Sequence, residues 1–170
     1  GVILQAESNS PPKENQGTST LASVNASDFL DNPMLVEEVF GPYSLLVKAG
    51  NIEQLKEAVH KIPGQLTASI IGEEDELIRY ADFVQLVIEK AGRVIINGVP
   101  TGVEVCPSMH HGGPFPATTD SRFTSVGTDA IKRFVRPVSF QNFPDALLPA
   151  ELKQNNPLGI WRLFNNEIRK

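Results

Sequence analysis

The chain has 170 residues, a formal net charge of −5 and a pI near 5.2. This acidic balance argues against nucleic acid and membrane surfaces as partners, because both attract clusters of Lys and Arg. No apolar run approaches the roughly 18 residues of a membrane span, and the first residues do not resemble a signal peptide. With 41% hydrophobic residues and one cysteine, the composition favours a single globular domain in the cytoplasm.

The first part of the chain is expected to contain strands joined by polar loops. Residues 1–7 suit the end of a helix or strand, and residues 8–17 form a polar, exposed loop that contains a Pro pair. Residues 18–25 are a strand candidate, and residues 28–34 are expected to be a loop that ends at an Asn-Pro step.

The middle of the chain predicts alternating strands and helices. Three short apolar runs of strand length occupy residues 44–49, 66–71 and 93–97. Two stretches with apolar residues at helical spacing separate them. This β-α-β-α-β order is typical of right-handed crossovers in a parallel sheet with helical cover.

Both predicted helices carry end signals. The first begins at Asn51, with Gln54 in the capping-box position, and ends at Pro63-Gly64. The second opens on the acidic residues 73–76, which suit a helix N-terminus, and is expected to stop at Gly92. Its buried stripe is predicted to be formed by Leu77, Ala81, Val84, Ile88 and Ala91.

The remaining third is expected to be largely irregular. Residues 98–123 form a long Gly/Pro-rich loop, and loops of this length in a compact domain are often functional. A short amphipathic helix at 126–134 and an edge strand at 138–140 follow, and then an apolar tail at 144–170 that must dock on some surface. The predicted fold class is therefore α/β: a parallel-type sheet with flanking helices, a long loop and an apolar C-terminal tail.

The most specific motif is Glu37-Glu38-Val39-Phe40-Gly41-Pro42, placed directly before an apolar strand. It closely resembles a signature of the aldehyde dehydrogenase superfamily. The resemblance implies that Glu38 accepts hydrogen bonds from the hydroxyls of the nicotinamide-side ribose and that Phe40 packs near the nicotinamide ring. A carboxylate is a suitable bidentate acceptor for two vicinal hydroxyls.

The order of elements after this motif is similar to the C-terminal half of that family's catalytic domain. The resemblance therefore makes residues 1–170 a single C-terminal portion of the domain, with an oligomerisation strand and tail in residues 136–170. Asn97 matches a strand-end asparagine that braces neighbouring loops, although a plain turn asparagine is equally compatible. Segments 97–101, 110–116 and 136–144 most resemble the α-ketoglutarate semialdehyde (2,5-dioxovalerate) dehydrogenase branch.

No catalytic residue is expected in this chain. In the family, a cysteine thiolate attacks the aldehyde to form a thiohemiacetal, but that nucleophile lies upstream of the motif, and only 36 residues precede Glu37 here. Cys106 lies downstream, where the resemblance implies a wall of the substrate tunnel, and His111 is expected near the polar end of the substrate. The chain alone should therefore be inactive and bind no cofactor, while the complete enzyme would use NAD or NADP.

Three further side chains could have other roles. The adjacent His110 and His111 point in different directions and lack neighbouring ligands at metal-site spacing, so no metal is expected. Arg122 could pair with a carboxylate substrate, but pairing with a surface acid is the favoured interpretation.

Several alternatives remain open on the sequence. The chain could belong to an NADP-dependent fatty-aldehyde dehydrogenase, act as a non-enzymatic α/β interaction domain, or be a small enzyme that uses Cys106. Under the main interpretation, its partners are the upstream part of the same enzyme, a small aldehyde and further copies of itself, with self-association through residues 136–140 or the tail.

Overall fold

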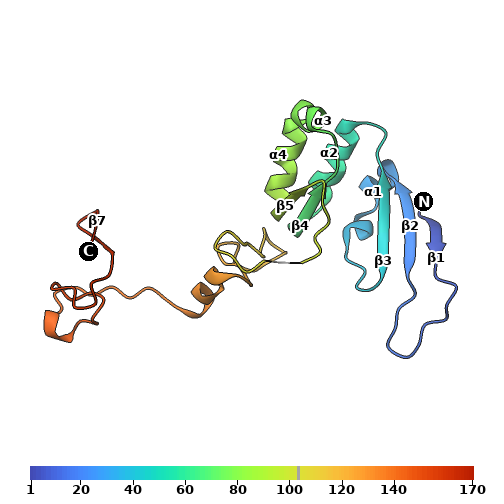
Figure 1. The fold of residues 1–170 in the computed structure, drawn as a ribbon. Helices are drawn as coiled ribbons and strands as arrows, with labels where there is room; N and C mark the ends of the chain where they lie inside the picture. The colour runs from blue at the N-terminus through green and yellow to red at the C-terminus, as the bar shows by residue number, and fades with distance from the viewer. Residues whose placement is uncertain (103) are drawn as a thin grey trace. The chain divides into compact units, whose positions relative to one another are not determined.

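A computed structural model describes residues 1–102 and 104–170 of the chain, which is mixed α/β (Figure 1). The chain divides into two compact units, residues 1–134 and residues 135–170. Among the described residues, no helix is long and apolar enough to cross a membrane.

The first unit opens with a three-stranded sheet. Strand β1 (Ile3–Glu7) pairs antiparallel with β2 (Thr20–Asn25), which pairs parallel with β3 (Tyr43–Lys48). The predicted strands and the exposed loop at residues 8–17 are confirmed. In the register of β2 and β3, Ala22 lies opposite Leu45 and Val24 opposite Val47, so these apolar side chains share one face of the sheet.

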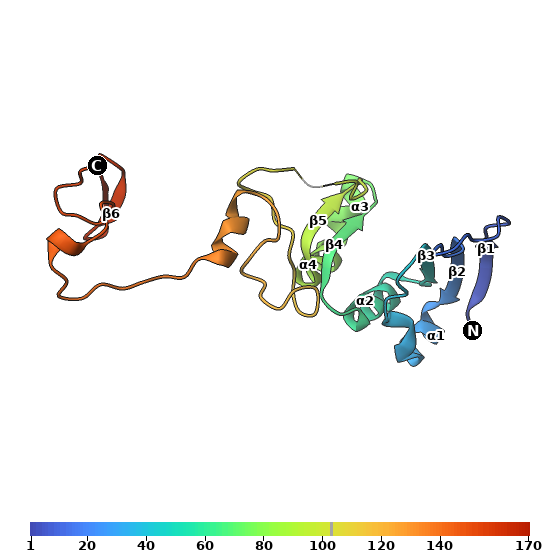
Figure 2. The same cartoon turned by 90° about the horizontal axis from the view of Figure 1, so that it is seen from below.

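Helices cover that face of the sheet (Figure 2). They are α1 (Ala26–Asp31), the 3-10 helix η1 (Pro33–Val36) and α2 (Ile52–Lys61). The buried core joins Val24, Phe29 and Ala58. The prediction of a loop at residues 28–34 is therefore wrong: the packing of Phe29 under the sheet favours a short helix despite the loop-like composition.

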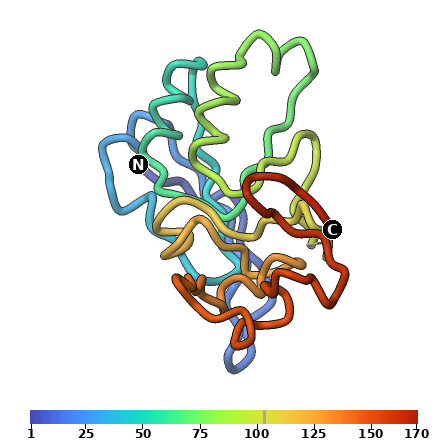
Figure 3. The backbone as a smooth tube through the Cα atoms, turned by 90° about the vertical axis from the view of Figure 1, so that its left-hand side faces the viewer, coloured from blue at the N-terminus to red at the C-terminus, as the bar shows by residue number. Residues whose placement is uncertain are grey.

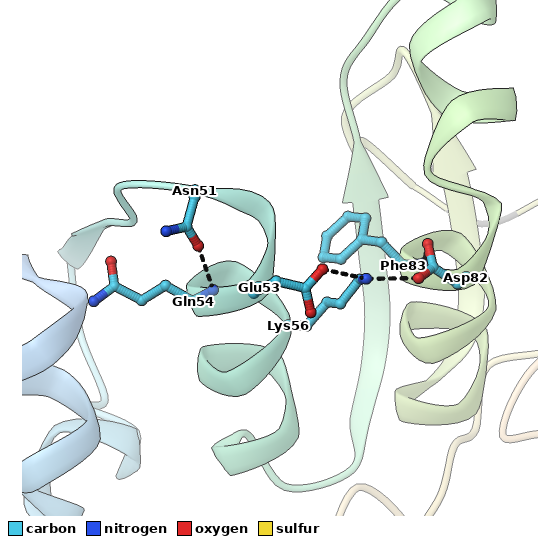
Figure 4. Close-up of polar contacts among 6 residues, drawn as sticks. All are labelled: Asn51, Glu53, Gln54, Lys56, Asp82 and Phe83. Atoms are coloured by element: carbon cyan, nitrogen blue, oxygen red, sulfur yellow. Dashed lines mark hydrogen bonds and ion pairs between the residues drawn. The ribbon is translucent and has the colours of Figure 1, made fainter.

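The predicted N-cap is present at the start of α2, but one of its two hydrogen bonds is shifted by one residue. The Asn51 side chain accepts a hydrogen bond from the Gln54 N–H at 2.9 Å, as expected for an N-cap. The Gln54 side chain, however, accepts from the Gly50 N–H at 2.8 Å rather than from the Asn51 N–H (Figure 4 shows the cap itself). The reciprocal bond of the capping box is thus shifted one residue toward the N-terminus.

Lysine side chains link α2 to the following helix region. The Lys56 ammonium contacts Glu53 at 2.9 Å and Asp82 at 2.6 Å (Figure 4). These contacts raise the pKa of Lys56, and the hydrogen bond from Lys56 lowers the pKa of Asp82. At the other end of α2, the Lys90 ammonium donates to the carbonyls of His60 and Ile62, which suits the negative end of the helix dipole.

A second, two-stranded parallel sheet follows, made of β4 (Gln65–Ile70) and β5 (Ala91–Ile96). The connection between them is two helices, α3 (Glu74–Arg79) and α4 (Ala81–Lys90), not the single helix predicted. The break lies at Tyr80, whose ψ of 39° departs from helical geometry. The β-α-β order is confirmed, but β3 and β4 do not pair, so the strands belong to two sheets rather than one.

The break also changes which face of the second helix is buried. Leu86 and Val87 are the buried residues of α4, while Ala81 and Ile88 are exposed, contrary to the predicted stripe. Helices α2 and α4 pack over one face of β4, and Leu55, Val59, Phe83 and Val87 line a small apolar pocket of about 330 Å³ there.

A long irregular loop and a 3-10 helix end the first unit (Figure 3). The described residues 98–102 and 104–127 contain neither helix nor strand, which confirms the predicted loop. The amphipathic helix predicted for 126–134 is present as η2 (Thr128–Phe134) but is a 3-10 helix.

The second unit is small and held by polar contacts. It contains η3 (Asp145–Leu147) and a hairpin of β6 (Arg162–Phe164) and β7 (Glu167–Arg169). The Arg162 guanidinium donates to the carbonyls of Glu151, Lys153 and Gln154. The edge strand predicted at 138–140 is absent from the described structure, since an edge strand requires a neighbouring strand to pair with.

Candidate functional site

The turn at residues 37–42 is anchored at both ends. The Glu37 N–H donates to the Met34 carbonyl and closes η1, while the Pro42 carbonyl accepts from the Thr20 N–H at 2.9 Å. Gly41 has a φ of 152°, which residues with a side chain rarely adopt. The turn therefore has a defined path from η1 into β3.

Glu38 and Phe40 are displayed outward on this turn. Phe40 is 95% exposed, although an aromatic ring of this size normally buries most of its surface. Glu38 is also exposed, and within the described residues no hydrogen bond or ion pair occupies its carboxylate. Both side chains are free to meet another molecule.

Glu37 and Glu38 form the exposed rim of a groove of about 920 Å³. Deeper in the groove lie apolar side chains, among them Phe29 beneath the sheet and Leu45 and Val47 of β3. The start of β4 and residues 116–117 of the long loop complete its lining. The groove thus joins an acidic rim to an apolar floor.

Asn97 lies directly after β5 and ties the ends of two strands together. Its side-chain oxygen accepts from the Gly72 N–H, and its side-chain nitrogen donates to the Gly72 carbonyl, both at 2.9 Å. Its own N–H donates to the Ile70 carbonyl at 2.8 Å. Asn97 has a φ of 52°, a left-handed conformation that asparagine tolerates better than most residues.

Cys106 and His111 lie on the long loop and do not line the groove beside Glu38. The half-buried Cys106 has its sulfur 3.3 Å from the Ser108 hydroxyl oxygen. The His111 N–H donates to the Thr124 hydroxyl, and the His111 carbonyl accepts from the Ser125 N–H and hydroxyl. The buried Nδ1 of His111 has no partner within the described structure.

Three glycines hold this loop against the starts of β4 and β5, a contact that the sequence did not reveal. A Cβ on Gly92 would lie 1.9 Å from the Gly112 carbonyl oxygen, and one on Gly64 would lie 2.2 Å from the Pro114 carbonyl oxygen. A Cβ on Gly113 would lie 2.3 Å from the Gln65 carbonyl oxygen. Gly92 was predicted to stop a helix, but it lies inside β5, where the loop needs its missing side chain.

Comparison with known proteins identifies the family. No protein-family model matches the chain. The chain is 53% identical over 137 residues to an alpha-ketoglutaric semialdehyde dehydrogenase of Acinetobacter baylyi, covering 81% of this chain. It is 46% identical over 148 residues to alpha-ketoglutaric semialdehyde dehydrogenase 2 of Azospirillum brasilense, covering 87% of this chain. The chain belongs to the aldehyde dehydrogenase superfamily.

The matched stretch is 26% of the Acinetobacter protein and 28% of the Azospirillum protein. This aldehyde dehydrogenase segment therefore spans little more than a quarter of the length of these curated relatives. The names of both relatives confirm the predicted resemblance to the α-ketoglutarate semialdehyde branch.

Replacing Asn97 should destabilise the dehydrogenase segment in a way that separates two causes. Asn97→Ala removes both side-chain hydrogen bonds. It also leaves a residue in the left-handed region that cannot hydrogen-bond locally as asparagine does, so we expect the free energy of unfolding to fall by about 2–3 kcal/mol. Asn97→Gly loses the same bonds without that strain, so we expect a smaller loss of about 1–2 kcal/mol. Urea unfolding measures both, and an Ala variant as stable as the unchanged chain would contradict this account.

Arg122 pairs with a nearby acid, as the sequence favoured. Its guanidinium donates to both carboxylate oxygens of Asp120, at 2.9 and 2.6 Å. The hydrogen bonds from Arg122 lower the pKa of Asp120 from 3.8 to about 2. Because the folded-state pKa is depressed, the stabilisation from this pair is present above pH 3.8 and is lost as the pH falls toward 2.

This pair provides a pH test of the loop structure. An NMR titration of the Asp120 carboxyl carbon should show a midpoint near 2. Arg122→Gln should raise that midpoint toward 3.8, because the guanidinium donors are gone. Arg136→Gln, which removes the same charge from the second unit, is the matched control and should leave it unchanged. A midpoint near 3.8 in the unchanged chain would show that the pair does not form.

The described residues contain no group of three or more His, Cys, Asp or Glu that could hold a metal ion. His110 and His111 therefore have no further ligand beside them in the part of the chain that the structure describes.

Proposed function

We propose that this chain forms one wall of the active site of an NAD(P)-dependent dehydrogenase that oxidises α-ketoglutaric semialdehyde to 2-oxoglutarate. The substrate class is supported by the names of both relatives. The observation that carries the proposal is the exposed, unengaged Glu38 carboxylate beside a Phe40 ring that is 95% exposed. An aromatic ring with this exposure marks a surface that suits contact with a ligand or with another part of the enzyme.

The residues present suit the nicotinamide half of the cofactor. The two oxygens of Glu38 can accept hydrogen bonds from two vicinal ribose hydroxyls, and the bonds are strengthened by the negative charge. The flat apolar face of Phe40 suits contact with a planar heteroaromatic ring. When bound, NAD or NADP accepts a hydride from the substrate carbon.

The other proposed roles belong to residues on the long loop or at its start. Cys106 and His111 would line the substrate tunnel, and Asn97 would support the loop where it leaves β5. The nucleophile that forms the thiohemiacetal would lie in the remainder of the enzyme, and Cys106 would not be catalytic. The Ser108 hydroxyl lies 3.3 Å from the Cys106 sulfur, whereas activation of a thiolate needs a base or a cation.

We propose that residues 136–170 contribute to self-association. In the β6–β7 hairpin, Leu163 lies opposite Ile168, so both point to one face together with Trp161 two residues earlier. All three side chains are at least 70% exposed.

The complete enzyme would work in the cytoplasm, where an unpaired cysteine such as Cys106 stays reduced.

A hybrid enzyme tests the proposed function. In it, this chain replaces its matched counterpart in the Acinetobacter baylyi dehydrogenase, with which it is 53% identical. The hybrid should oxidise α-ketoglutaric semialdehyde with NAD+ or NADP+, while the isolated chain should show no activity. Cys106→Ser in the hybrid should retain most of the activity. A folded hybrid without dehydrogenase activity, or one inactivated by Cys106→Ser without loss of structure, would refute the proposal.

A further inference from the structure

Asn97 is followed directly by Gly98, and it is the only asparagine of the chain that precedes a glycine. Asparagine is thermolabile, because the main-chain nitrogen of the next residue can attack its side-chain amide. A glycine in the next position favours this attack, since it has no Cβ to shield its nitrogen and its backbone is permissive. Asn97 is also exposed, so water reaches it. The Asn97-Gly98 step therefore has the composition and the exposure of a deamidation site.

Deamidation at this step needs water and no other reactant. A bond forms between the Gly98 nitrogen and the Asn97 Cγ, the bond from Cγ to Nδ2 breaks, and ammonia leaves with the proton of the Gly98 N–H. Water then opens the resulting succinimide ring at either of its carbonyls. Opening at Cγ gives aspartate, and opening at the main-chain carbonyl gives isoaspartate, in which the backbone runs through the former side chain. Overall, water is consumed and ammonia is released.

In the folded chain, the reacting amide is engaged with another residue. The Asn97 Nδ2 donates to the Gly72 carbonyl and the Asn97 Oδ1 accepts from the Gly72 N–H, both at 2.9 Å. These bonds join the ends of β4 and β5, which lie side by side as a parallel pair (Figure 1). The leaving nitrogen must give up its bond to Gly72, and Cγ must turn toward Gly98. The reaction therefore requires that this end of the sheet opens first.

We propose that Asn97-Gly98 is a deamidation site that the two bonds to Gly72 keep unreactive, and that deamidation makes a transient opening of the β4–β5 end permanent. An aspartate at position 97 has no side-chain N–H to donate, so the Gly72 carbonyl loses its partner and faces a negative charge. An isoaspartate adds a carbon to the main chain at the start of the long loop. This inference is independent of the proposed function, because its contacts lie within the described chain.

Peptide mapping by mass spectrometry tests the protection in the full 170-residue chain. Gln16→Gly creates a second Asn-Gly step at Asn15, in the exposed loop of residues 8–17, and serves as a reference within the same molecule. The Gln16 side chain accepts from the Lys13 N–H of the same loop, so its loss should not reach the core. In mildly alkaline buffer, Asn15 should convert at least about tenfold faster than Asn97, because Asn97 reacts only from a locally opened state.

A urea series of the same variant separates protection from low reactivity. As urea unfolds the chain, the conversion rate at Asn97 should rise to that at Asn15. Equal rates at the two steps without urea, in a chain that circular dichroism shows to unfold cooperatively as urea is added, would overturn the protection by Gly72. Slow conversion of Asn97 in the unfolded chain, with Asn15 converting, would overturn the assignment of a deamidation site.

Asn97→Asp tests the consequence, because it places the aspartate product in the chain directly. Its urea midpoint should fall, since the donor to the Gly72 carbonyl is lost. Asn51→Asp is the matched control: the Asn51 side chain supplies an acceptor oxygen to the Gln54 N–H, and a carboxylate supplies the same acceptor with a charge that suits a helix N-terminus. The control midpoint should stay or rise. An unchanged midpoint for Asn97→Asp would overturn the proposed permanent opening.

Discussion

Glu38→Gln in the hybrid enzyme is expected to lower kcat/KM for the cofactor about 10- to 100-fold. The amide keeps the size of the side chain but replaces one acceptor oxygen with a donor and removes the charge. Hydrogen bonds to a charged group contribute about 1.5–3 kcal/mol, which corresponds to the expected range. Steady-state kinetics with the cofactor as varied substrate measures the change.

Glu37→Gln is the matched control for this prediction. Glu37 is adjacent, exposed and on the same groove rim, so its substitution removes the same charge from nearly the same place. We expect kcat/KM for the cofactor to change by less than about threefold, because solvent and salt screen an exposed charge that makes no direct hydrogen bond to the cofactor. Equal losses for both variants would indicate a general electrostatic effect, and no loss for Glu38→Gln would remove the ribose contact from this residue.

Gly92→Ala is expected to destabilise the chain by about 3 kcal/mol or to displace the long loop. The added methyl would lie 1.9 Å from the Gly112 carbonyl oxygen and 2.9 Å from the Gly113 Cα, so backbone must move. Urea unfolding measures the stability, and hydrogen exchange of residues 110–117 reports whether the loop has moved away.

Gly102→Ala is the control, because a Cβ at Gly102 meets no atom within 4 Å. It makes the same substitution on the long loop that follows β5 and should change stability by less than about 0.5 kcal/mol. If both alanine variants behave alike, the close approach between β5 and the loop does not exist in solution.

Local signals in the sequence predicted the local parts of the fold. Asn51 was identified as a helix cap because its side chain bonds to a backbone group three residues away. The apolar runs predicted β3, β4 and β5 because a strand of this kind needs only bulky apolar residues in a short stretch. Each of these features depends on a few neighbouring residues.

Features that depend on distant contacts were missed. Gly92 resembles a helix stop in its local context, but it lies in a strand. A glycine is needed there because the Gly112 carbonyl, twenty residues later, leaves no room for a Cβ. The segment around Phe29 is helical because Phe29 packs against Val24 in the core, although the nearby Asn-Pro step indicated a loop. The break between α3 and α4 at Tyr80 could not be predicted, because no glycine or proline lies at that position.

The candidate site shows the same division. Glu38 and Phe40 were predicted to contact the cofactor because the whole motif is contiguous, and their exposure could not be inferred from it. The groove beside them combines residues from η1, β3, β4 and the long loop, which are far apart in the chain. The sequence also did not indicate that β3 and β4, which both line this groove, belong to separate sheets.

The loop between β1 and β2 has a practical consequence for handling the protein. Residues 8–17 are all exposed, and the loop is closed at its base by the Ser8 N–H donating to the Ser19 carbonyl. Beyond that base, β1 is held to β2 by their own backbone ladder. The loop tip is therefore a suitable place to insert an affinity tag or a fluorophore.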